Sequence, residues 1–398
     1  MNILLVADGR STITHSWLEC IAAADEHIDL ISTFPCEKPA QVERMLILPV
    51  AFSALAGGQV TLGDQKKQSK RFKKKLSGLR SLLLNLRYRW GPGTLPFFRQ
   101  RYVDFVEQCQ PDVVHALRIP FEGMLASYTP AQFPLVVSTW GNDLTLHACG
   151  SRRMARWTTK ALQRADGLMA DATRDLELAR DFGYRDGLPR LMVPGNGGVN
   201  LDVFRAMSDP KDRSSKPTTY QVINPRGFRP GSVHQDVFFQ SIPLIRKEIP
   251  DIRFICTAMQ GQPQAERFVR DLGIADNVLL LPYLSQSELW SLYKDCDIYI
   301  SLSSHDGTPN TFLEAIACGC FPVVGDIASL RQWIRDEHNG LLVNPLDVEQ
   351  VASAIVRALR DAPMRQTAKI TNWNILLEKA DRNKVHTSVM VFYRQLID

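Results

Sequence analysis

Short apolar strands alternate with amphipathic helices along almost the whole chain, and this alternation restricts the possible folds more than any other feature. NILLVA (2–7) and LVVST (135–139) are examples of strand-like runs, and segments with apolar residues at helical spacing separate such runs. This order is typical of βαβ units, whose strands form parallel sheets with helices packed on their faces. We therefore predict an α/β protein built on parallel sheets.

A polar stretch divides the alternation into two halves. Residues 206–219, AMSDPKDRSSKPTT, lack apolar periodicity and have the composition of a linker. Ligands of parallel sheets bind beyond the carboxyl ends of the strands, so two such lobes would enclose a central cleft that their sheets face. The predicted parts are a first lobe at 1–198, an interlobe linker at 199–219, a second lobe at 220–373 and a C-terminal helical segment at 374–398.

The predicted elements follow from the same periodicity. Strands are expected at 2–7, 28–32, 45–48, 112–116, 135–139, 167–170, 190–193, 220–224, 253–257, 278–281, 298–301, 321–324 and 340–343. Helices are expected at 14–24, 72–88, 95–109, 151–164, 173–182, 234–247, 264–271, 286–294, 309–318, 327–335, 348–360 and 374–396.

Composition places the chain among ordinary globular proteins of a reducing compartment. Of the 398 residues, 45% are hydrophobic and 22% are charged. The eight cysteines form no C-x-x-C pair and no cluster at zinc spacing, so we expect free thiols. The start of the chain lacks the basic n-region of a signal peptide, and its longest apolar stretch is too short to cross a bilayer. We expect a cytoplasmic protein.

The segment SSHDGTPNTFLEAIACGCFPVV (303–324) carries the strongest chemical signal. A buried strand ends at a loop, Thr308 is a good N-cap, and Pro309 suits the first helical position. The amides of Asn310 and Thr311 then point out of the helix start, where the helix dipole favours an anion. Gly307 lets a ligand approach the backbone, so the sequence predicts a phosphate site here.

Two acids flank this predicted phosphate site. Asp306 lies just before the helix, and Glu314 follows after seven intervening residues, about one and a half turns into the helix. One carboxylate can accept hydroxyl groups of a sugar, and the other can accept those of a ribose on the opposite side of the diphosphate. Isolated acids at this spacing would more often be solvated ends of a capped helix, but the complete strand–loop–helix context favours a donor site.

These residues resemble the donor-site motif of the retaining GT-B glycosyltransferases of family 4. The resemblance rests on an acid, seven residues, Glu-Ala, a helix ending in small residues and a Pro-Val-Val strand. PGNGGVNLDVF (194–204) is similar to the interlobe segment of that family, and NPRGFRP…DVFFQSI is similar to the first strand–loop–helix of its nucleotide lobe. TNWNILLEKA…VFYRQLI resembles its C-terminal helix, which returns towards the first lobe. The resemblance implies a GT-B fold with two Rossmann-like lobes.

The resemblance also implies how the donor is held. In that family an Arg and a Lys in the first loop of the second lobe grip the diphosphate, and Arg226 matches the Arg. The lysine position falls near His234–Gln235, so the lysine is missing; we group His234 with the donor-binding residues and expect Arg229 to substitute. A second departure is Asp306, where many members have the longer Glu.

The resemblance implies retention by a front-face mechanism, which needs no protein nucleophile and no cofactor. The leaving diphosphate can accept the acceptor proton, while Arg226, Arg229 and the helix start stabilise its charge. The sequence D-C-D at 295–297 mimics a metal motif but precedes its strand, at the wrong end of the sheet, so we expect no metal.

Acceptor contacts are expected in the first lobe. Gly9 follows the first strand, and His15 lies near the start of the next helix, where an exposed or capping histidine is equally consistent. Relatives often have a His after the strand at 135–139, but this chain has Trp140. We take Trp140, Asp143 and His115 as further candidates.

A basic segment at 66–90 accounts for the net charge of +5. It holds ten Lys/Arg and no acid, so the remaining residues sum to about −5. Its apolar residues recur at helical spacing and are Phe72, Leu76, Leu79, Leu83, Leu86 and Trp90. Two interpretations stay open: attraction to the anionic inner face of a membrane, or an apolar stripe packed on the first lobe with solvated cations. Nucleic-acid binding is not expected, because the aromatic residues are not placed as stacking platforms.

The sequence thus predicts a retaining glycosyltransferase. It would move a sugar from a nucleoside-diphosphate donor to a glycan or lipid-linked acceptor, in cell-envelope or exopolysaccharide synthesis. Two other classes stay open. A nucleotide-sugar isomerase of the same shape would convert donor without acceptor, and a non-catalytic nucleotide-binding scaffold would bind nucleotide without turnover.

Overall fold

The computed structural model contains two compact units, each with one parallel sheet. It describes residues 1–22, 25–55, 86–207, 219–229 and 231–397. The first unit comprises Met1–Gly197 and Asn383–Asp398, and the second comprises Gly198–Arg382. Of the predicted basic helix at 72–88, residues 72–85 lie outside the described residues.

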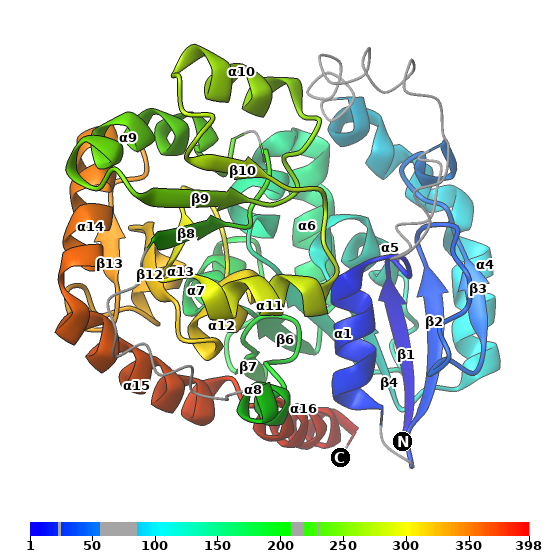
Figure 1. Ribbon diagram of the computed structural model, residues 1–398. Coiled ribbons are helices and arrows are strands. Elements are labelled where there is room, and N and C mark those ends of the chain that lie inside the picture. The colour runs from blue at the N-terminus through cyan, green and yellow to red at the C-terminus, as the bar shows by residue number, and fades with distance from the viewer. Residues whose placement is uncertain (23–24, 56–85, 208–218, 230, 398) are drawn as a thin grey trace. The chain divides into compact units, whose positions relative to one another are not determined.

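The first unit has a seven-stranded sheet of order β3-β2-β1-β4-β5-β6-β7, and every pair in it is parallel (Figure 1). Its strands are β1 Asn2–Ala7, β2 His27–Ser32, β3 Met45–Ile47, β4 Val113–Ala116, β5 Leu135–Thr139, β6 Gly167–Ala170 and β7 Arg190–Met192. Its helices are α1 Thr12–Ile21, α4 Leu95–Cys109, α5 Met124–Ala126, α6 Arg152–Arg164, α7 Thr173–Asp181 and, from residue 383 on, α16 Arg382–Ile397.

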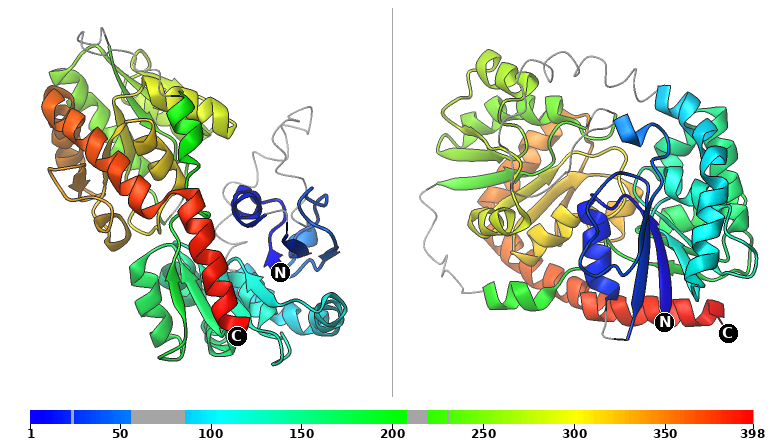
Figure 2. Two further views of the ribbon diagram at one scale, coloured as in Figure 1. Left: turned by 90° about the horizontal axis from the view of Figure 1, so that it is seen from below. Right: turned by 90° about the vertical axis from the view of Figure 1, so that its right-hand side faces the viewer.

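The two faces of this sheet are covered by different helices. Side chains of α4, α5 and α6 form one apolar cluster with one face of the central strands. On the opposite face, α1 and α16 form a second cluster; Figure 2 shows α16 as the red helix. Residues from both ends of the chain therefore share one core.

The second unit has a six-stranded parallel sheet of order β10-β9-β8-β11-β12-β13. Its strands are β8 Tyr220–Asn224, β9 Ile252–Cys256, β10 Val278–Leu280, β11 Ile298–Ser301, β12 Phe321–Gly325 and β13 Leu341–Val343. Its helices are α8 Leu201–Met207, α9 Gln235–Glu248, α10 Pro263–Asp271, α11 Gln286–Asp295, α12 Asn310–Ala317, α13 Ala328–Arg331, α14 Val348–Arg360 and α15 Ala362–Lys379.

Serine and aspartate side chains begin several of these helices. Ser151 Oγ accepts the amide of Met154 at the start of α6, and Ser285 forms a capping box with Glu288 at the start of α11. Asp347 caps α14 by accepting the amide of Gln350. Each of these helices begins where a side chain satisfies an amide of its first turn.

Two predictions, for the segments near residues 199 and 380, differ from the structure. The single helix expected at 374–396 is two helices, α15 and α16, interrupted at Ala380–Asp381. There the carbonyl of Ala380 accepts the amide of Val199, and the amide of Arg382 donates to the carbonyl of Val199. The segment expected as a linker at 199–219 begins with the helix α8.

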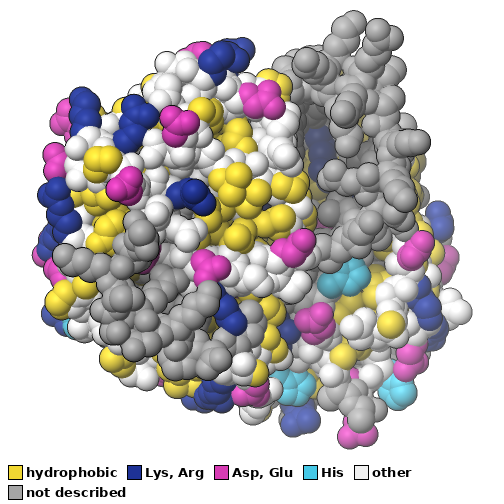
Figure 3. Space-filling view, in the orientation of Figure 1, with side chains coloured by type: hydrophobic (Ala, Val, Ile, Leu, Met, Phe, Trp, Pro, Cys, Tyr) yellow, Lys and Arg dark blue, Asp and Glu magenta, His cyan; other side chains and the backbone are white. Residues whose placement is uncertain are grey.

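The described surface mixes charges of both signs with apolar side chains. On the face shown in Figure 3, acidic and basic side chains are interspersed among apolar patches. Within the described residues, no helix combines the length and apolarity that crossing a membrane requires.

Candidate functional site

The two sheets each have a switch point, where neighbouring strands lead to helices on opposite faces. It lies between β8 and β11 in the second sheet and between β1 and β4 in the first. Ligands of such sheets bind beyond the carboxyl ends of the strands at these points. The loops after these four strands are therefore the first places to look for chemistry.

An ion pair joins the two loops at the switch point of the second sheet. Arg226, two residues after β8, pairs through Nη2 with Oδ2 of Asp306 in the loop after β11. Arg226 is 6% exposed, and its Nε has no hydrogen-bond partner in the described structure. Asp306 also accepts the Ser303 hydroxyl at 3.3 Å and the Gly307 amide at 3.1 Å. The guanidinium is thus held in one orientation at the edge of the sheet.

A buried amide network fixes the loop that carries Arg226. Asn224 Nδ2 donates to Gln235 Oε1 at 2.7 Å, and Gln235 Nε2 donates to the carbonyls of Arg226 and Gly227 at 3.1 and 3.0 Å. Asn224 Oδ1 accepts the amide of Arg226 at 3.2 Å. Gln235 therefore supports the loop from the region where a lysine was expected, a role that the sequence did not suggest.

Arg229 adds a second positive charge beside Arg226. Arg229 is exposed, and the positive charge of Arg226 lowers its pKa to about 10, although Asp306 opposes this shift. The two arginines lie three residues apart in the loop after β8, so their positive charges repel each other. An anionic ligand would relieve this repulsion.

The helix after β11 begins one residue later than predicted. Pro309 is the N-cap of α12, with φ −68° and ψ 131°, and no side chain caps the helix start. Thr308 is buried and accepts instead from Trp333 Nε1 at 3.0 Å and from Gln332 Nε2 at 3.2 Å. The expectation that Thr308 caps the helix, with Pro309 in its first turn, is therefore wrong by one position.

The remaining donor candidates on these loops lie around that helix start. Asn310 and Thr311 are the first two residues of α12, and the Thr311 hydroxyl lies 3.2 Å from the hydroxyl of the buried Tyr299. Gly307 is buried. His234 precedes α9, and its Nε2 lies 3.0 Å from Ser304 Oγ in the loop after β11. His234 therefore links the same two loops as the Arg226–Asp306 pair.

Glu314 is a buried carboxyl on α12. It is 6% exposed, and its Oε1 accepts from Gln286 Nε2 of α11 at 2.6 Å. Burial raises its pKa to about 7, while hydrogen bonds from Gln286 and Trp290 and the charge of Arg382 lower it. A carboxylate has two acceptor oxygens with about four lone-pair sites, so Glu314 is able to accept a ligand hydroxyl as well.

A cavity of about 290 Å³ lies at the switch point of the first sheet. Asp8 and Arg10 follow β1, Phe34 follows β2, and Arg118 and Glu122 follow β4. Phe121 in the last of these loops has φ 72°, a left-handed conformation that costs energy in residues other than glycine. Strain of this kind concentrates at binding sites.

Asp143 and Trp140 organise the wall of this cavity. Asp143 is 1% exposed and pairs with Arg118 Nη2 at 2.6 Å. Its Oδ2 also accepts the amides of Ile119 at 3.1 Å and Trp140 at 3.3 Å. Trp140 lines the cavity, so Asp143 acts through the residues it holds.

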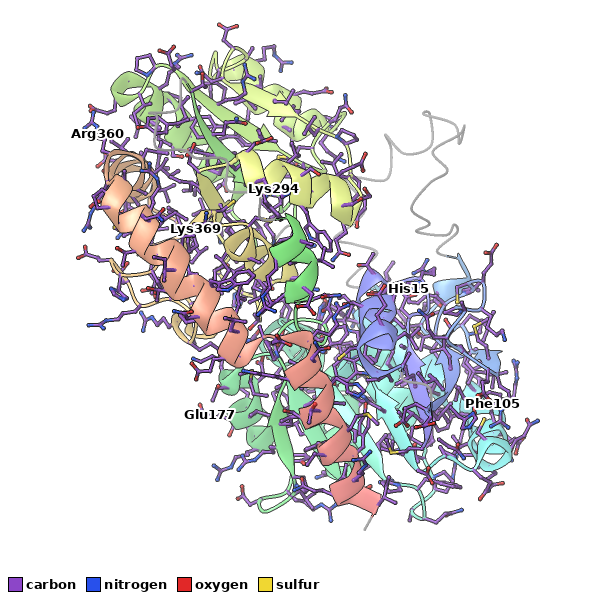
Figure 4. All side chains as sticks on the ribbon, turned by 60° about the horizontal axis from the view of Figure 1, so that its bottom comes forward. His15, Phe105, Glu177, Lys294, Arg360 and Lys369 are labelled. Carbon is purple, nitrogen blue, oxygen red and sulfur yellow. The ribbon has the colours of Figure 1, made fainter. Side chains whose placement is uncertain are left out.

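The other three acceptor candidates do not line the cavity. His115 is fully buried between Tyr393 and Ser138, whose oxygens lie 2.6 and 2.7 Å from its ring nitrogens, and burial lowers its pKa to about 3. It is a neutral core residue with no path to a ligand. His15 is exposed on α1 (Figure 4) and does not line the cavity. Gly9 is packed so closely that a Cβ would lie 2.5 Å from Cys36 Sγ, so it is required by the loop itself.

Three cavity residues were missed by sequence reasoning: Arg87, Arg118 and Glu122. The only available signal was a pair of opposite charges inside the apolar run LRIPFEGML (117–125). Arg87 is one of the ten Lys and Arg residues of the basic segment at 66–90, and the sequence did not distinguish it from the others. As to metals, the described residues contain no cluster of His, Cys, Asp or Glu able to hold an ion.

Residues 228–361 match the family model of glycosyl transferases group 1. This match covers most of the second unit and none of the first. The matched range contains Arg229, His234, Asp306 and Glu314, and so most of the site on the second sheet.

Two curated relatives align with somewhat less than half of the chain. A D-inositol 3-phosphate glycosyltransferase of Thermobispora bispora is 28% identical over 185 residues, which are 44% of this chain and 43% of that protein. That of Paenarthrobacter aurescens is 28% identical over 186 residues, 42% of this chain and 43% of that protein. The alignments therefore span less than half the length of these relatives.

Solved structures are similar to this chain over its whole length. Sucrose-phosphate synthase from Thermosynechococcus elongatus has a TM-score of 0.70 at 17% identity, with 100% of this chain and 99% of that chain covered. HepE of Anabaena in complex with UDP has a TM-score of 0.69 at 13% identity, covering 99% and 100%. HepE in complex with UDP-glucose has a TM-score of 0.66 at 15% identity, again covering 99% and 100%. The two parallel sheets and these neighbours identify the GT-B fold.

Proposed function

We propose that this protein is a retaining glycosyltransferase that moves a sugar from a nucleoside-diphosphate donor to a glycan or lipid-linked acceptor. The observation that carries the proposal is the cluster of Arg226, Arg229 and Asp306 at the switch point of the second sheet, beside the uncapped start of α12. Two guanidinium groups and a helix start form an anion site, which suits a diphosphate. The family match of residues 228–361 supports the same activity.

Each residue of the site then has a distinct part in transfer. Arg226 and Arg229 stabilise the charge that develops on the leaving diphosphate, which itself accepts the proton of the acceptor hydroxyl. Asp306 orients Arg226 and is placed to accept a hydroxyl of the donor sugar. Glu314 accepts ribose hydroxyls. This mechanism requires no protein nucleophile and no metal.

We further propose a uridine nucleotide as donor and a cytoplasmic location. HepE, of the same fold, has been solved with UDP and UDP-glucose, which supports testing uridine nucleotides first. A pathway in cell-envelope or exopolysaccharide synthesis fits a glycan or lipid-linked acceptor.

Glu314→Ala tests the donor site. We expect the variant to lose about 10- to 1000-fold in kcat/KM, roughly 1.4–4 kcal/mol, because the ribose contact is removed. Turnover is measured as nucleoside diphosphate released from a donor panel chosen by thermal shift, first with a panel of acceptors and then with donor alone. Glu349→Ala, at an exposed acid of α14, is the matched control and should keep full activity.

Three outcomes would contradict the proposal. Unchanged turnover of folded Glu314→Ala at low donor concentration would remove Glu314 from the site. Conversion of the donor sugar without any acceptor would indicate an isomerase, and nucleotide binding without turnover would indicate a scaffold.

A further inference from the structure

The cavity of the first unit carries charges that the proposed donor chemistry does not use. Two of its three guanidinium groups have their own acids. Arg10 pairs with Asp8 at 3.1 Å and stacks 3.7 Å above the Phe34 ring, and Arg118 pairs with Asp143 at 2.6 Å. Each of these ion pairs has no net charge. The arginine of each pair lines the cavity.

Arg87 is the third guanidinium, and its Nε is buried without a hydrogen-bond partner among the described residues. Its Cζ lies 4.6 Å from the centre of the Phe121 ring and 5.5 Å from that of Phe34. Burial lowers its pKa, an effect that Glu122 opposes and Arg118 reinforces. The side chain is therefore held by ring contacts while a buried donor lacks an acceptor.

Glu122 has an unsatisfied oxygen in the same cavity. The residue is 3% exposed, and its Oε1 accepts the Thr33 hydroxyl at 2.7 Å. Its Oε2 is buried without a partner in the described structure, and so is Nε of Arg118. Buried polar atoms of this kind are costly unless a ligand or water completes them.

The charge of the cavity depends on Glu122. Burial raises its pKa to about 7, although Arg118, the Thr33 hydroxyl and Arg87 lower it. The nearby His147 has a pKa lowered to about 4 by burial, and burial raises the pKa of Tyr88, so both are neutral near pH 7. With Glu122 protonated, three guanidinium groups face only the two carboxylates of Asp8 and Asp143.

We propose that this cavity binds the acceptor through an anionic group, a phosphate or a carboxylate carried on a sugar ring. Arg87 and Arg118 donate to its oxygens, and the protonated carboxyl of Glu122 donates a further hydrogen bond through Oε2. Phe34 and Phe121, which line the cavity, contact the ring carbons. The inference rests on the proposed transfer reaction, since it names the chemistry of the acceptor.

Matched ligands test the anionic group. Calorimetric titration of the full chain, without donor, uses glucose 6-phosphate, glucuronate and glucose as probes. We expect at least one anionic sugar to bind about 10- to 100-fold more tightly than glucose, because charge-assisted hydrogen bonds are the stronger ones. Which of the two binds more tightly separates a phosphate ester from a uronate. Equal affinity for all three, or no binding of either anion, overturns the proposal.

Arg87→Ala and Arg89→Ala are matched variants, because the two arginines lie two residues apart in the sequence. Arg89 is exposed and does not line the cavity. We expect Arg87→Ala to lose the preference for the anionic sugar and Arg89→Ala to keep it. Arg87→Met, which preserves most of the ring contact, should behave like Arg87→Ala if charge is the cause. Retention of the preference in both Arg87 variants contradicts the assignment.

The pH dependence of binding is a second, independent test, because it depends on the proton of Glu122. If binding needs protonated Glu122, affinity for the anionic sugar should fall by about 10-fold between about pH 6 and about pH 8, since a raised carboxyl ionises across that range. Glucuronate suits this series because its own carboxylate stays ionised throughout. Glu122→Gln keeps a neutral donor at every pH, so its affinity should be flat. A wild-type profile that is flat, or a Glu122→Gln profile as steep as the wild type, refutes this role of Glu122.

The donor site provides the check that separates the two proposals. UDP and other nucleoside diphosphates are titrated into the same variants by thermal shift. Nucleotide binding without a preference for an anionic sugar overturns only the acceptor inference. Absence of nucleotide binding in every variant and in the wild type overturns the proposed function itself.

Discussion

Arg226 and Arg229 should share the charge of the donor diphosphate, so that each partly compensates for the loss of the other. Arg226→Ala leaves Asp306 without its ion-pair partner, and Arg229, whose pKa Asp306 raises, is able to take its place. We therefore expect each single change to weaken nucleoside-diphosphate binding by about 1.5–3 kcal/mol, with a non-additive double variant. Titration calorimetry measures all three variants.

The control for this series is Arg253→Ala. Arg253 is exposed on β9 of the same unit and should be neutral. If nucleotide affinity is unchanged in both single variants and in the double variant, neither arginine belongs to the donor site.

At the scale of elements, strands were predicted more closely than helix ends. β1, β5, β6, β8 and β11 have the predicted bounds, because buried parallel strands are short β-branched runs between polar loops. The break between α15 and α16 was not predicted, since no Gly or Pro marks it. It depends on the contact of Ala380 and Arg382 with Val199, which is distant in sequence.

The same reasoning explains which parts of the candidate site could be predicted. Asp306 and Glu314 lie on one loop and the helix that follows it, so local spacing was enough to place them. The pairing of Asp306 with Arg226 could not be predicted from spacing, because it depends on β8 lying beside β11. For Glu122 the only signal was its charge, opposite to that of Arg118, within an apolar run, because burial rather than residue type raises its pKa.

Helix α16 is expected to stabilise the first unit through the buried hydrogen bond of Tyr393 to His115 as well as through apolar packing. Tyr393→Phe leaves one ring nitrogen of His115 buried and unpaired, which should cost about 1–3 kcal/mol in the free energy of unfolding. Urea unfolding of the full chain measures the change. Tyr283→Phe is the matched control, because Tyr283 is 60% exposed. Equal stability of the two variants would show that this bond contributes nothing.

At the scale of the whole molecule, we propose peripheral contact with the inner face of a membrane through residues 66–90. Residues 66–85 lie outside the described structure, but the last residues of the segment, 86–90, are described. Leu86 is 46% exposed and Trp90 is 57% exposed, so the last two positions of the apolar stripe are not buried in the first unit. Trp at such a position is a suitable interfacial anchor.

Vesicle co-sedimentation tests this contact. We expect binding to anionic but not neutral vesicles, lost at high salt because each cation near the surface contributes only about 1 kcal/mol. Changing Lys73, Lys74 and Lys75 to Glu should abolish binding. Changing Lys247, Arg267 and Lys369, all exposed in the second unit, to Glu should leave most of it. Absence of vesicle binding by the wild type at low salt would leave an enzyme that meets its acceptor in solution.

The shared core of α1 and α16 has a consequence for the order in which the protein folds on the ribosome. Residues 198–382 form a continuous unit that can fold as soon as it has emerged. The first unit emerges earlier but lacks Val389, Phe392 and Tyr393 of its own core until residues 198–382 have been translated. One apolar face of its sheet therefore stays uncovered while the second unit is being synthesised. During this interval the nascent chain would most need a chaperone.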